Sequence, residues 1–298
     1  MLEVKNISKS YGTHLAVDHL SFEVDKGEIF GLLGENGAGK TTTFRIIMGL
    51  LEPNSGTVTL DGKKIDYSVT DRIGFVTEER SLLTKMTVKN QLLYYGTLKG
   101  MTEETILKRL DEWLEKFGIT EYKNRKIKEL SKGNQQKIQF IAGIINNPKL
   151  LILDEPFSGL DPINVKMFQE AILELKEKGC SIIFSSHQME HIELFCEKLV
   201  ILVKGKVVLS GYLKDIKKEY RKKNIFIEGD ILVDKLKKIL GVLEVVKNAN
   251  EYQVKIESDQ IVDSVFQAIS KNKIRKFVVE EASLNEIFIE KVGESYDK

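Results

Sequence analysis

The segment Gly31–Thr42 reads GLLGENGAGKTT and carries the pattern G-x-x-x-x-G-K-T from Gly34 to Thr41. The apolar run Ile29–Leu33 predicts a strand and Thr41–Leu50 predicts a helix, which is the context that a phosphate-binding loop requires. Its glycines let successive backbone N–H groups surround a phosphate, and the start of the helix adds partial positive charge. The alternative is an ordinary glycine-rich turn. We predict that the phosphates of a nucleotide are bound by Gly34, Asn36, Gly37, Gly39, Lys40, Thr41 and Thr42.

A second motif, LLILDEP at Leu150–Pro156, places two carboxylates at the end of a buried strand. We expect Lys40 to reach the β- and γ-phosphates, and the Thr41 hydroxyl and Asp154 to hold Mg²⁺. The adjacent Glu155 can orient or deprotonate an attacking water. The alternative is a charged pair that only solvates the end of a strand. Together the two motifs predict a magnesium-dependent ATPase.

The composition sets limits on the class of protein. With 298 residues, 42% of them hydrophobic and 30% charged, the chain allows one large domain or two modest ones. The net charge of +1, from 45 basic and 44 acidic residues, gives no overall reason to bind nucleic acid, and no such partner is expected. A basic run at Lys214–Lys223 is interpreted as a solvated linker or helix face, with contact to anionic lipid headgroups as the alternative.

Location is also constrained by the sequence. Two cysteines, Cys180 and Cys196, cannot form a disulfide framework and fit a reducing cytosol. The N-terminus has no apolar signal region, and the uncharged apolar runs are far shorter than the roughly 20 residues that span a bilayer. We expect a cytoplasmic protein that could act at a membrane only through a partner.

Strands and helices alternate through the first two thirds of the chain. Short strands fill residues 1–30, an Asp-Gly hairpin follows at Ser55–Ile65, and residues 85–130 show helical periodicity. Then come an apolar strand at 149–156, a helix at 163–178, a strand at 181–186, a helix at 190–197 and a strand at 198–205. Alternation at this spacing predicts a parallel sheet flanked by helices.

The composition changes around Tyr212–Lys223, and a different order of elements follows. Strands are expected at 224–229, 244–248, 251–257 and 274–281, and helices at 231–240, 260–272 and 283–293. The order β-α-β-β-α-β is that of a small α+β ferredoxin-like domain. We therefore predict an α/β chain with one domain at 1–215 and an accessory domain at 216–298.

Four further motifs occur in an order that is typical of one family. LSKGNQQ begins at Leu130 and lies ahead of the acidic strand, and SGLD, Ser158–Asp161, follows it directly. His187 stands in SSHQMEH at the end of a strand, and Tyr11 stands in SKSYG. Each could have a plain structural role by itself. With the phosphate loop and the acidic strand, the chain resembles the nucleotide-binding subunit of ATP-binding-cassette (ABC) transporters over residues 1 to about 215.

The resemblance implies a P-loop ABC ATPase domain with a parallel sheet core, an antiparallel β subdomain and a helical subdomain at about 80–145. It implies that Tyr11 stacks on adenine, that His187 contacts the γ-phosphate, and that Glu155, His187 and Lys40 are catalytic. Ser131 and Gly133 are implied to bind the γ-phosphate of ATP held by a second subunit, so a homodimer is the simpler hypothesis. The partner implied is a polytopic membrane permease, which would hold the protein at the inner face of the cell membrane.

Two departures from the common pattern are visible. Lys132 and Asn134 replace the usual Gly and Gln of the signature, and Glu78 stands where a glutamine usually senses Mg²⁺. A glutamate can still ligate a hard cation through oxygen, so Glu78 is a candidate metal ligand. EER, Glu78–Arg80, together with LSKGNQQ, resembles the ABC-2 exporter branch, and SLNEIFIEKVG at 283–293 resembles the accessory C-terminal domain of that branch.

Two rival interpretations remain open at this point. One is a soluble ABC-type ATPase that acts on ribosomes or DNA, although a single phosphate loop and no heptad tract speak against it. The other is a binding module that uses ATP only as a conformational switch. The segment after Glu78, with its helices to about Leu130, is where permease contact is expected.

Overall fold

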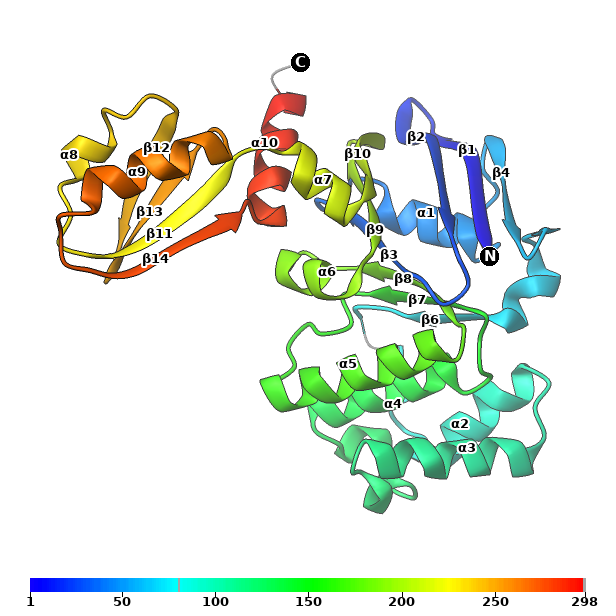
Figure 1. The fold of residues 1–298 in the computed structure, drawn as a ribbon. Coiled ribbons are helices and arrows are strands. Elements are labelled where there is room, and N and C mark those ends of the chain that lie inside the picture. Colours follow the sequence, from blue (N-terminus) through cyan, green and yellow to red (C-terminus); the bar gives the residue numbers. More distant parts are fainter. Residues whose placement is uncertain (80, 297–298) are drawn as a thin grey trace. The chain divides into compact units, whose positions relative to one another are not determined.

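The computed structural model describes residues 1–79 and 81–296, and the chain divides into two units, Met1–Ser210 and one that begins at Gly211 (Figure 1). Residues 211–215, which the sequence placed in the first domain, group with the second unit. Arg80, the last residue of EER and the first of the predicted helical subdomain, lies outside the described residues.

A six-stranded sheet forms the centre of the first unit. Its order is β10-β9-β3-β8-β7-β6, and the pairs β3–β8, β3–β9, β6–β7 and β7–β8 are parallel. The strands are β3 (Ile29–Gly34), β6 (Ile73–Val76), β7 (Leu150–Asp154), β8 (Ser181–Ser185), β9 (Lys198–Val203) and β10 (Lys206–Tyr212). The strands β3, β7, β8 and β9 are buried and almost entirely apolar, as expected of parallel strands that are covered on both faces. Parallel β3 and β7 end at the same edge, which brings the phosphate loop close to the acidic pair.

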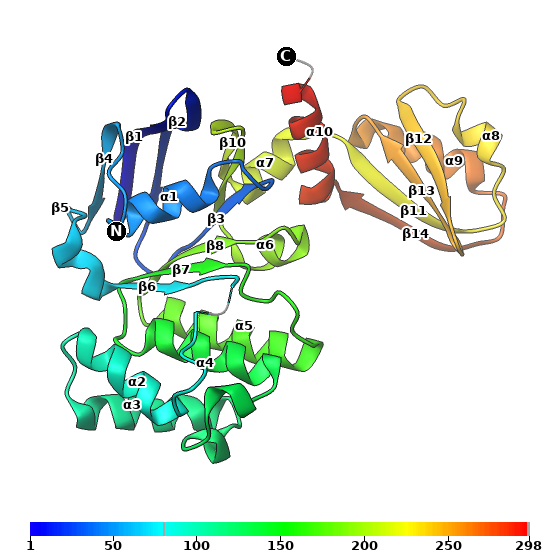
Figure 2. The same cartoon turned by 180° about the vertical axis from the view of Figure 1, so that it is seen from behind.

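A second, antiparallel sheet has the order β2-β1-β4-β5. Its strands are β1 (Leu2–Tyr11), β2 (His14–Val24), β4 (Ser55–Leu60) and β5 (Lys63–Lys64). The predicted Asp-Gly turn joins β4 to β5, with positive φ at both Asp61 (51°) and Gly62 (74°). Figure 2 shows this sheet and the six-stranded sheet from behind.

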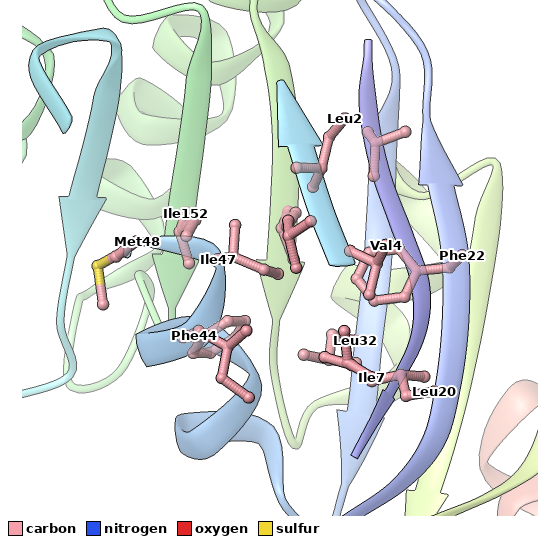
Figure 3. Close-up of a cluster of buried hydrophobic side chains, with 14 of the residues drawn as sticks. Leu2, Val4, Ile7, Leu20, Phe22, Leu32, Phe44, Ile47, Met48 and Ile152 are labelled. Carbon is pink, nitrogen blue, oxygen red and sulfur yellow. The ribbon is translucent and has the colours of Figure 1, made fainter. Parts of the chain in front are cut away.

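The core of the first unit lies between these two sheets, with α1 (Lys40–Ile47) contributing Phe44 and Ile47 (Figure 3). The rings of Phe22 on β2 and Phe30 on β3 stack with centroids 4.6 Å apart, which links one sheet to the other. The helix was predicted to reach Leu50 but ends at Ile47. Gly49 adopts a φ of 70°, the left-handed conformation with which helices commonly terminate.

The helical region comprises α2 (Val88–Leu98), α3 (Glu103–Lys116), η2 (Thr120–Tyr122), η3 (Ile127–Glu129) and α4 (Lys132–Ile144). On the sheet lie α5 (Pro162–Glu177) and α6 (Met189–Phe195), and η1 (Tyr67–Arg72) precedes β6. Phe140 of α4 packs against Trp113 and Phe168, with ring centroids 6.2 Å and 5.0 Å apart. Trp113, which is half-buried, therefore packs against the core of the helical region.

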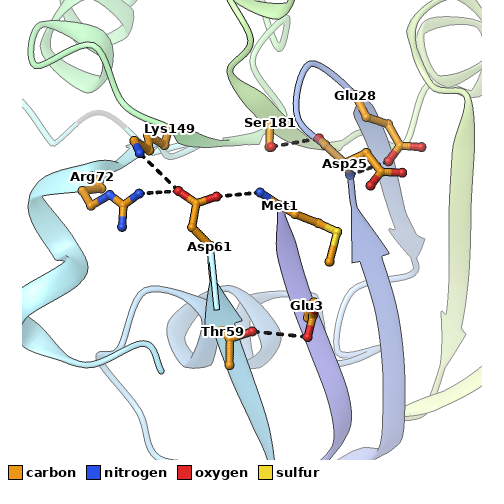
Figure 4. A network of polar contacts seen from close by, with 9 residues as sticks. All are labelled: Met1, Glu3, Asp25, Glu28, Thr59, Asp61, Arg72, Lys149 and Ser181. Atoms are coloured by element: carbon orange, nitrogen blue, oxygen red, sulfur yellow. Dashed lines mark hydrogen bonds and ion pairs between the residues drawn. The ribbon is translucent and has the colours of Figure 1, made fainter. Parts of the chain in front are cut away.

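Asp61 joins parts of the first unit that are distant in sequence (Figure 4). Its Oδ1 lies 2.8 Å from the amino group of Met1, and its Oδ2 pairs with Arg72 and, at 3.2 Å, with Lys149. Arg72 and Lys149 stand directly before β6 and β7. The amino group of Met1, followed by Lys149, holds the pKa of the Asp61 carboxyl well below its usual value.

The second unit contains α7 (Leu213–Glu219), β11 (Lys223–Gly229), α8 (Val233–Leu236), β12 (Val242–Asn248), β13 (Glu251–Ile256), η4 (Asp259–Ile261), α9 (Val262–Ile269), β14 (Ile274–Glu281) and α10 (Leu284–Tyr296). Its antiparallel sheet has the order β12-β13-β11-β14, so the ferredoxin-like prediction is confirmed. The helix predicted at 231–240 is wrong in length. Only Val233–Leu236 is helical, and Leu236 alone of these four is buried.

Candidate nucleotide-binding and hydrolysis site

A cavity of about 690 Å³ opens at the carboxyl ends of β3 and β7. Every residue that the sequence proposed for the site lines it, except Ser131 and Gly133. The lining comprises Tyr11, His14, Ala16, Gly34, Glu35, Asn36, Gly37, Gly39, Lys40, Thr41, Thr42, Glu78, Asp154, Glu155 and His187. The fold thus brings together residues from five separate parts of the chain.

The phosphate loop depends on glycine at Gly34, Gly37 and Gly39. Gly37 and Gly39 have φ values of 83° and 106°, where side chains are rarely tolerated. A Cβ on Gly39 would also lie 2.3 Å from the carbonyl oxygen of Ala16. Gly39 directly precedes α1, and the backbone N–H of Thr43 donates to its carbonyl at 2.9 Å. The backbone therefore turns sharply into the helix and leaves the first N–H groups of α1 at the cavity.

Lys40 stands at the first position of α1. Its ammonium donates to the carbonyl oxygens of Gly34, at 2.6 Å, and Glu35, at 3.1 Å. Burial lowers the pKa of Lys40, while the charges of Asp154, Glu155 and Glu78 act in the opposite direction. A half-buried cation beside neutral carbonyls is suited to a strongly anionic ligand, because phosphate oxygens can replace these weaker acceptors.

The two carboxylates at the end of β7 have different environments. Burial raises the pKa of Asp154 above its usual value, against the favourable charge of Lys40. Glu155 has a φ of 50°, and its backbone N–H donates to the carbonyl of Ser185 at 3.0 Å. A non-glycine residue held in the left-handed region is uncommon and is found preferentially at functional sites.

The side chain of Glu155 is held by two neighbours. The hydroxyl of Ser186 donates to Oε2 at 3.2 Å, and Nδ1 of His187 lies 2.9 Å from the same oxygen. The Glu155 side chain is 11% exposed, whereas that of His187 is 66% exposed. The carboxylate of Glu155 is therefore held in a buried position, and the imidazole of His187 that contacts it is largely exposed.

The residues proposed for Mg²⁺ fit this ion by their chemistry. Thr41, Asp154 and Glu78 offer one hydroxyl and two carboxylates, and all three line the same cavity. Among the described residues no group of three or more His, Cys, Asp or Glu forms a metal cluster. Mg²⁺ is usually held by one or two carboxylates together with substrate phosphates rather than by a complete protein cage.

Tyr11 and His14 lie at one end of the cavity. Tyr11 is 46% exposed, so its ring is available to a planar base, and Lys9 Nζ lies 5.9 Å from the ring centroid. His14 faces Tyr11 across the β1–β2 hairpin. His14, Ala16 and Glu35 were missed by the sequence analysis. A tight turn at Gly12 was the only signal that could have placed His14 beside Tyr11.

Ser131 and Gly133 lie outside this cavity, at the start of α4. Ser131 is the N-cap of α4, and its Oγ accepts a hydrogen bond from the backbone N–H of Asn134 at 3.3 Å. Ser131 and Lys132 are exposed. The N-terminus of α4, with its partial positive charge, is therefore open to a ligand that this chain's own phosphate loop does not hold.

Comparison with known proteins identifies the family. The ABC transporter family model matches residues 17–158. The uncharacterized ABC transporter ATP-binding protein YhaQ of Bacillus subtilis (strain 168) is 48% identical over 298 residues, which is 100% of each chain. The chain belongs to the ATP-binding subunits of ABC transporters. As a member of this family it binds and hydrolyses ATP, and the predictions of fold and of ATPase activity are confirmed.

Residues 211–292 of this ABC subunit match the C-terminal domain of DrrA1-3-like ATP-binding proteins, which confirms the predicted branch. The linearmycin resistance ATP-binding protein LnrL of B. subtilis (strain 168) is 37% identical over 219 residues, 72% of this chain and 70% of LnrL. Neither YhaQ nor LnrL supports the rival interpretation of a soluble ATPase that acts on ribosomes or DNA. No helix among the described residues is long and apolar enough to cross a membrane.

Solved structures agree with this assignment. An ATP-binding subunit of an ABC transporter superposes with a TM-score of 0.70 at 33% identity, covering 74% of this ABC subunit and 93% of that chain. The dimeric post-hydrolysis cassette MJ0796, bound to ADP and Pi, gives a TM-score of 0.65 at 26% identity. The match covers 72% of this chain and 99% of the MJ0796 chain.

Proposed function

We propose that this subunit drives export as a homodimer that encloses two ATP molecules and docks on a separate membrane permease. The observation that carries the proposal is the division of the site. One cavity holds the phosphate loop, Asp154, Glu155 and His187, whereas the exposed start of α4 with Ser131 lies outside it. A second copy would bring its own Ser131 and Gly133 to the γ-phosphate. A dimer is in keeping with the MJ0796 cassette described above, which is dimeric in its post-hydrolysis structure.

Each residue of the cavity has a proposed role in hydrolysis. The loop N–H groups and the ammonium of Lys40 bind and orient the phosphates. Glu155 takes a proton from the attacking water as the water oxygen bonds to the γ-phosphorus and the bond to ADP breaks. His187 holds Glu155 through the 2.9 Å contact and is exposed enough to reach the γ-phosphate. When bound by Thr41, Asp154 and Glu78, Mg²⁺ would supply charge that offsets the triphosphate.

The proposed permease surface lies beside Glu78. A second cavity, of about 340 Å³, is lined by apolar side chains of the helical region and of β6, among them Phe75, Leu82 and Leu98. Leu98 is 64% exposed and Leu50, at the same cavity, is 65% exposed. Exposed apolar surface around a hollow is typical of a protein contact. A permease segment seated there would hold the subunit at the inner face of the cell membrane.

The partner is tested by purifying the tagged chain from native membranes in mild detergent and identifying what comes with it by mass spectrometry. We expect a polytopic membrane protein in stoichiometric amount. A variant that carries both Leu98→Glu and Leu50→Glu keeps the phosphate site and is expected to lose this protein. Recovery of the same partner by this variant would contradict the proposed surface. Recovery of ribosomal proteins or nucleic acid only, with the chain absent from membranes, would contradict the transporter role.

The homodimer and the general base are tested with Glu155→Gln. General-base catalysis contributes about 10²–10⁴-fold, so we expect turnover to fall by at least about a hundredfold. ATP that is bound but not hydrolysed should trap a dimer, which size-exclusion chromatography with light scattering would detect. A Glu155→Gln protein that stays monomeric with saturating ATP would refute the homodimer. Wild-type binding of ATP without turnover would revive the role of ATP as a switch only.

A further inference from the structure

The amide of Gln139 holds the two residues on either side of Glu78. Gln139 lies in α4 and is 5% exposed. Its Nε2 donates to the carbonyl of Thr77 at 2.8 Å, to the Thr77 hydroxyl at 3.0 Å and to the carbonyl of Glu79 at 3.1 Å. Because backbone carbonyls only accept hydrogen bonds, the nitrogen and not the oxygen of the amide must face the loop.

Gln139 Oε1 is left without a hydrogen-bond partner in the described residues, although it is buried. An unpaired buried carbonyl is unfavourable, and folded proteins keep few such groups. The hydrogen bonds from Nε2 to Thr77 and Glu79 therefore outweigh the cost of leaving Oε1 without a partner. Gln139 also lines the 340 Å³ cavity where the permease contact is proposed.

Two glycines bring α4 unusually close to β6, the strand that leads to Glu78. A Cβ on Gly74 of β6 would lie 2.3 Å from the carbonyl oxygen of Gly143 in α4. A Cβ on Gly143 would lie 2.8 Å from Cγ2 of Val76. Only at this short separation can the side chain of Gln139 reach past the end of β6 to the Glu78 loop. The helix α4 therefore lies close against β6 and is joined to the Glu78 loop by hydrogen bonds.

We propose that Gln139 is a positioning residue that fixes the Glu78 carboxylate for Mg²⁺ and ties its loop to the helix whose start carries Ser131. The inference rests on the proposed function, because it takes Glu78 as a metal ligand and Ser131 as a contact to the partner's ATP. Movement of α4 on engaging that ATP would then shift the Glu78 loop through the same helix. The link runs through Gln139 and does not pass through the phosphate loop.

The test is a titration of ATPase turnover with Mg²⁺ at saturating ATP, in the full chain. Gln139→Leu keeps the volume of the side chain and removes its donors. Residues that orient metal ligands typically change metal affinity or activity by 10–100-fold on mutation. We expect the Mg²⁺ concentration for half-maximal turnover to rise about tenfold, while binding of ATP measured without Mg²⁺ changes less than about twofold. Gln169→Leu, the same exchange at a half-buried position of α5, is the matched control.

Two further variants separate the possible outcomes. Thr77→Val removes one acceptor from the loop side and should shift the Mg²⁺ requirement in the same direction by a smaller factor. If circular dichroism shows that Gln139→Leu is unfolded, the Mg²⁺ requirement of Thr77→Val is the result that tests the inference. Glu78→Ala tests the proposed function itself. If Glu78→Ala raises the Mg²⁺ requirement but neither folded Gln139→Leu nor Thr77→Val does, the inference is overturned. If Glu78→Ala leaves it unchanged, the metal role of Glu78 is overturned.

Discussion

The surroundings of a side chain in the nucleotide cavity determine its properties more than its residue type does. Asp154 and Glu155 are adjacent carboxylates, yet burial raises the pKa of the first and a left-handed backbone turns the second toward His187. Neighbouring acids in one strand end can thereby serve different roles, one suited to a metal ion and one to water.

The aromatic ring of Tyr11 gives the first prediction at this scale. Stacking of a base on an aromatic side chain is worth about 1–3 kcal/mol by alanine substitution. Tyr11→Ala should therefore weaken ATP binding by about 5- to 150-fold, with the turnover of the bound nucleotide almost unchanged. Tyr11→Phe retains the ring and should bind as the wild type does, as measured with a fluorescent nucleotide. Equal losses in both variants would mean that the hydroxyl, and not stacking, matters.

Asp61 gives a prediction about pH. Its folded pKa is depressed by the Met1 amino group, so its contribution to stability is present above the unfolded pKa of about 3.9 and is lost as the pH falls through the folded value. The carboxyl is 38% exposed, and solvent screening limits its contribution to about 1 kcal/mol or less. Asp61→Asn suits the positive φ and should be less stable than the wild type at pH 7 by this amount.

Thermal unfolding at pH 7 and at pH 3 measures the effect of Asp61→Asn. The difference in stability between the two proteins should shrink as the pH falls to 3, because Asp61 of the unfolded wild type takes up a proton there before Asp61 of the folded protein does. High salt should also reduce the gap at pH 7. If the difference in stability between wild type and Asp61→Asn depended on neither pH nor salt, the ion pairs of Asp61 would contribute nothing to stability.

At the scale of elements, α4 combines three tasks along one helix. Its start is capped by Ser131, its middle holds the Glu78 loop through Gln139, and Phe140 packs in the aromatic cluster with α3 and α5. The glycine contact between α4 and β6 keeps the helix against the central sheet. A displacement of the start of α4 at Ser131 is therefore expected to displace Gln139 and the Glu78 loop that it holds.

Ser131→Ala tests the start of the helix. Loss of the N-cap should cost about 1 kcal/mol of stability, which thermal unfolding would detect. Because the serine is proposed to serve the partner's ATP, turnover should fall at least about tenfold, while binding of ATP to the monomer stays unchanged. Thr102→Ala, at the N-cap of α3, is the matched control for capping alone. Equal effects of the two variants on turnover would argue against a role of Ser131 in trans.

For the whole molecule, the division between Ser210 and Gly211 matters most. All residues that line the 690 Å³ cavity lie in the first unit, and the two units have separate hydrophobic clusters. Among the described residues, the lining of the nucleotide cavity is therefore supplied by the first unit.

A truncated chain of residues 1–210 should fold and bind ATP within about twofold of the full chain. A chain of residues 1–195 is the control, because it lacks β9, the neighbour of β3 in the central sheet, and should not fold. Circular dichroism and nucleotide titration measure both. An aggregated or inactive 1–210 protein would show that the first unit depends on the second.

The sequence alone was sufficient to predict the phosphate loop, the acidic strand end and the order of elements in both units. Those features are local: glycines fix backbone conformations, and apolar runs mark buried strands. The predicted lengths of α1 and α8 were wrong. The helix α1 ends ahead of Gly49, whose left-handed backbone stops it, and α8 is short because only Leu236 of its residues is buried. The length of α8 is thus set by packing, which a single sequence does not display.

Only the tertiary structure decided which residue holds the loop that carries Glu78. Gln139 reaches residues 77–79 although the two segments are about sixty residues apart in sequence. Such contacts follow from the register of strands and from the approach of Gly74 to Gly143. They are fixed by the meeting of distant segments in the folded core, and the sequence around each residue carries no local sign of them.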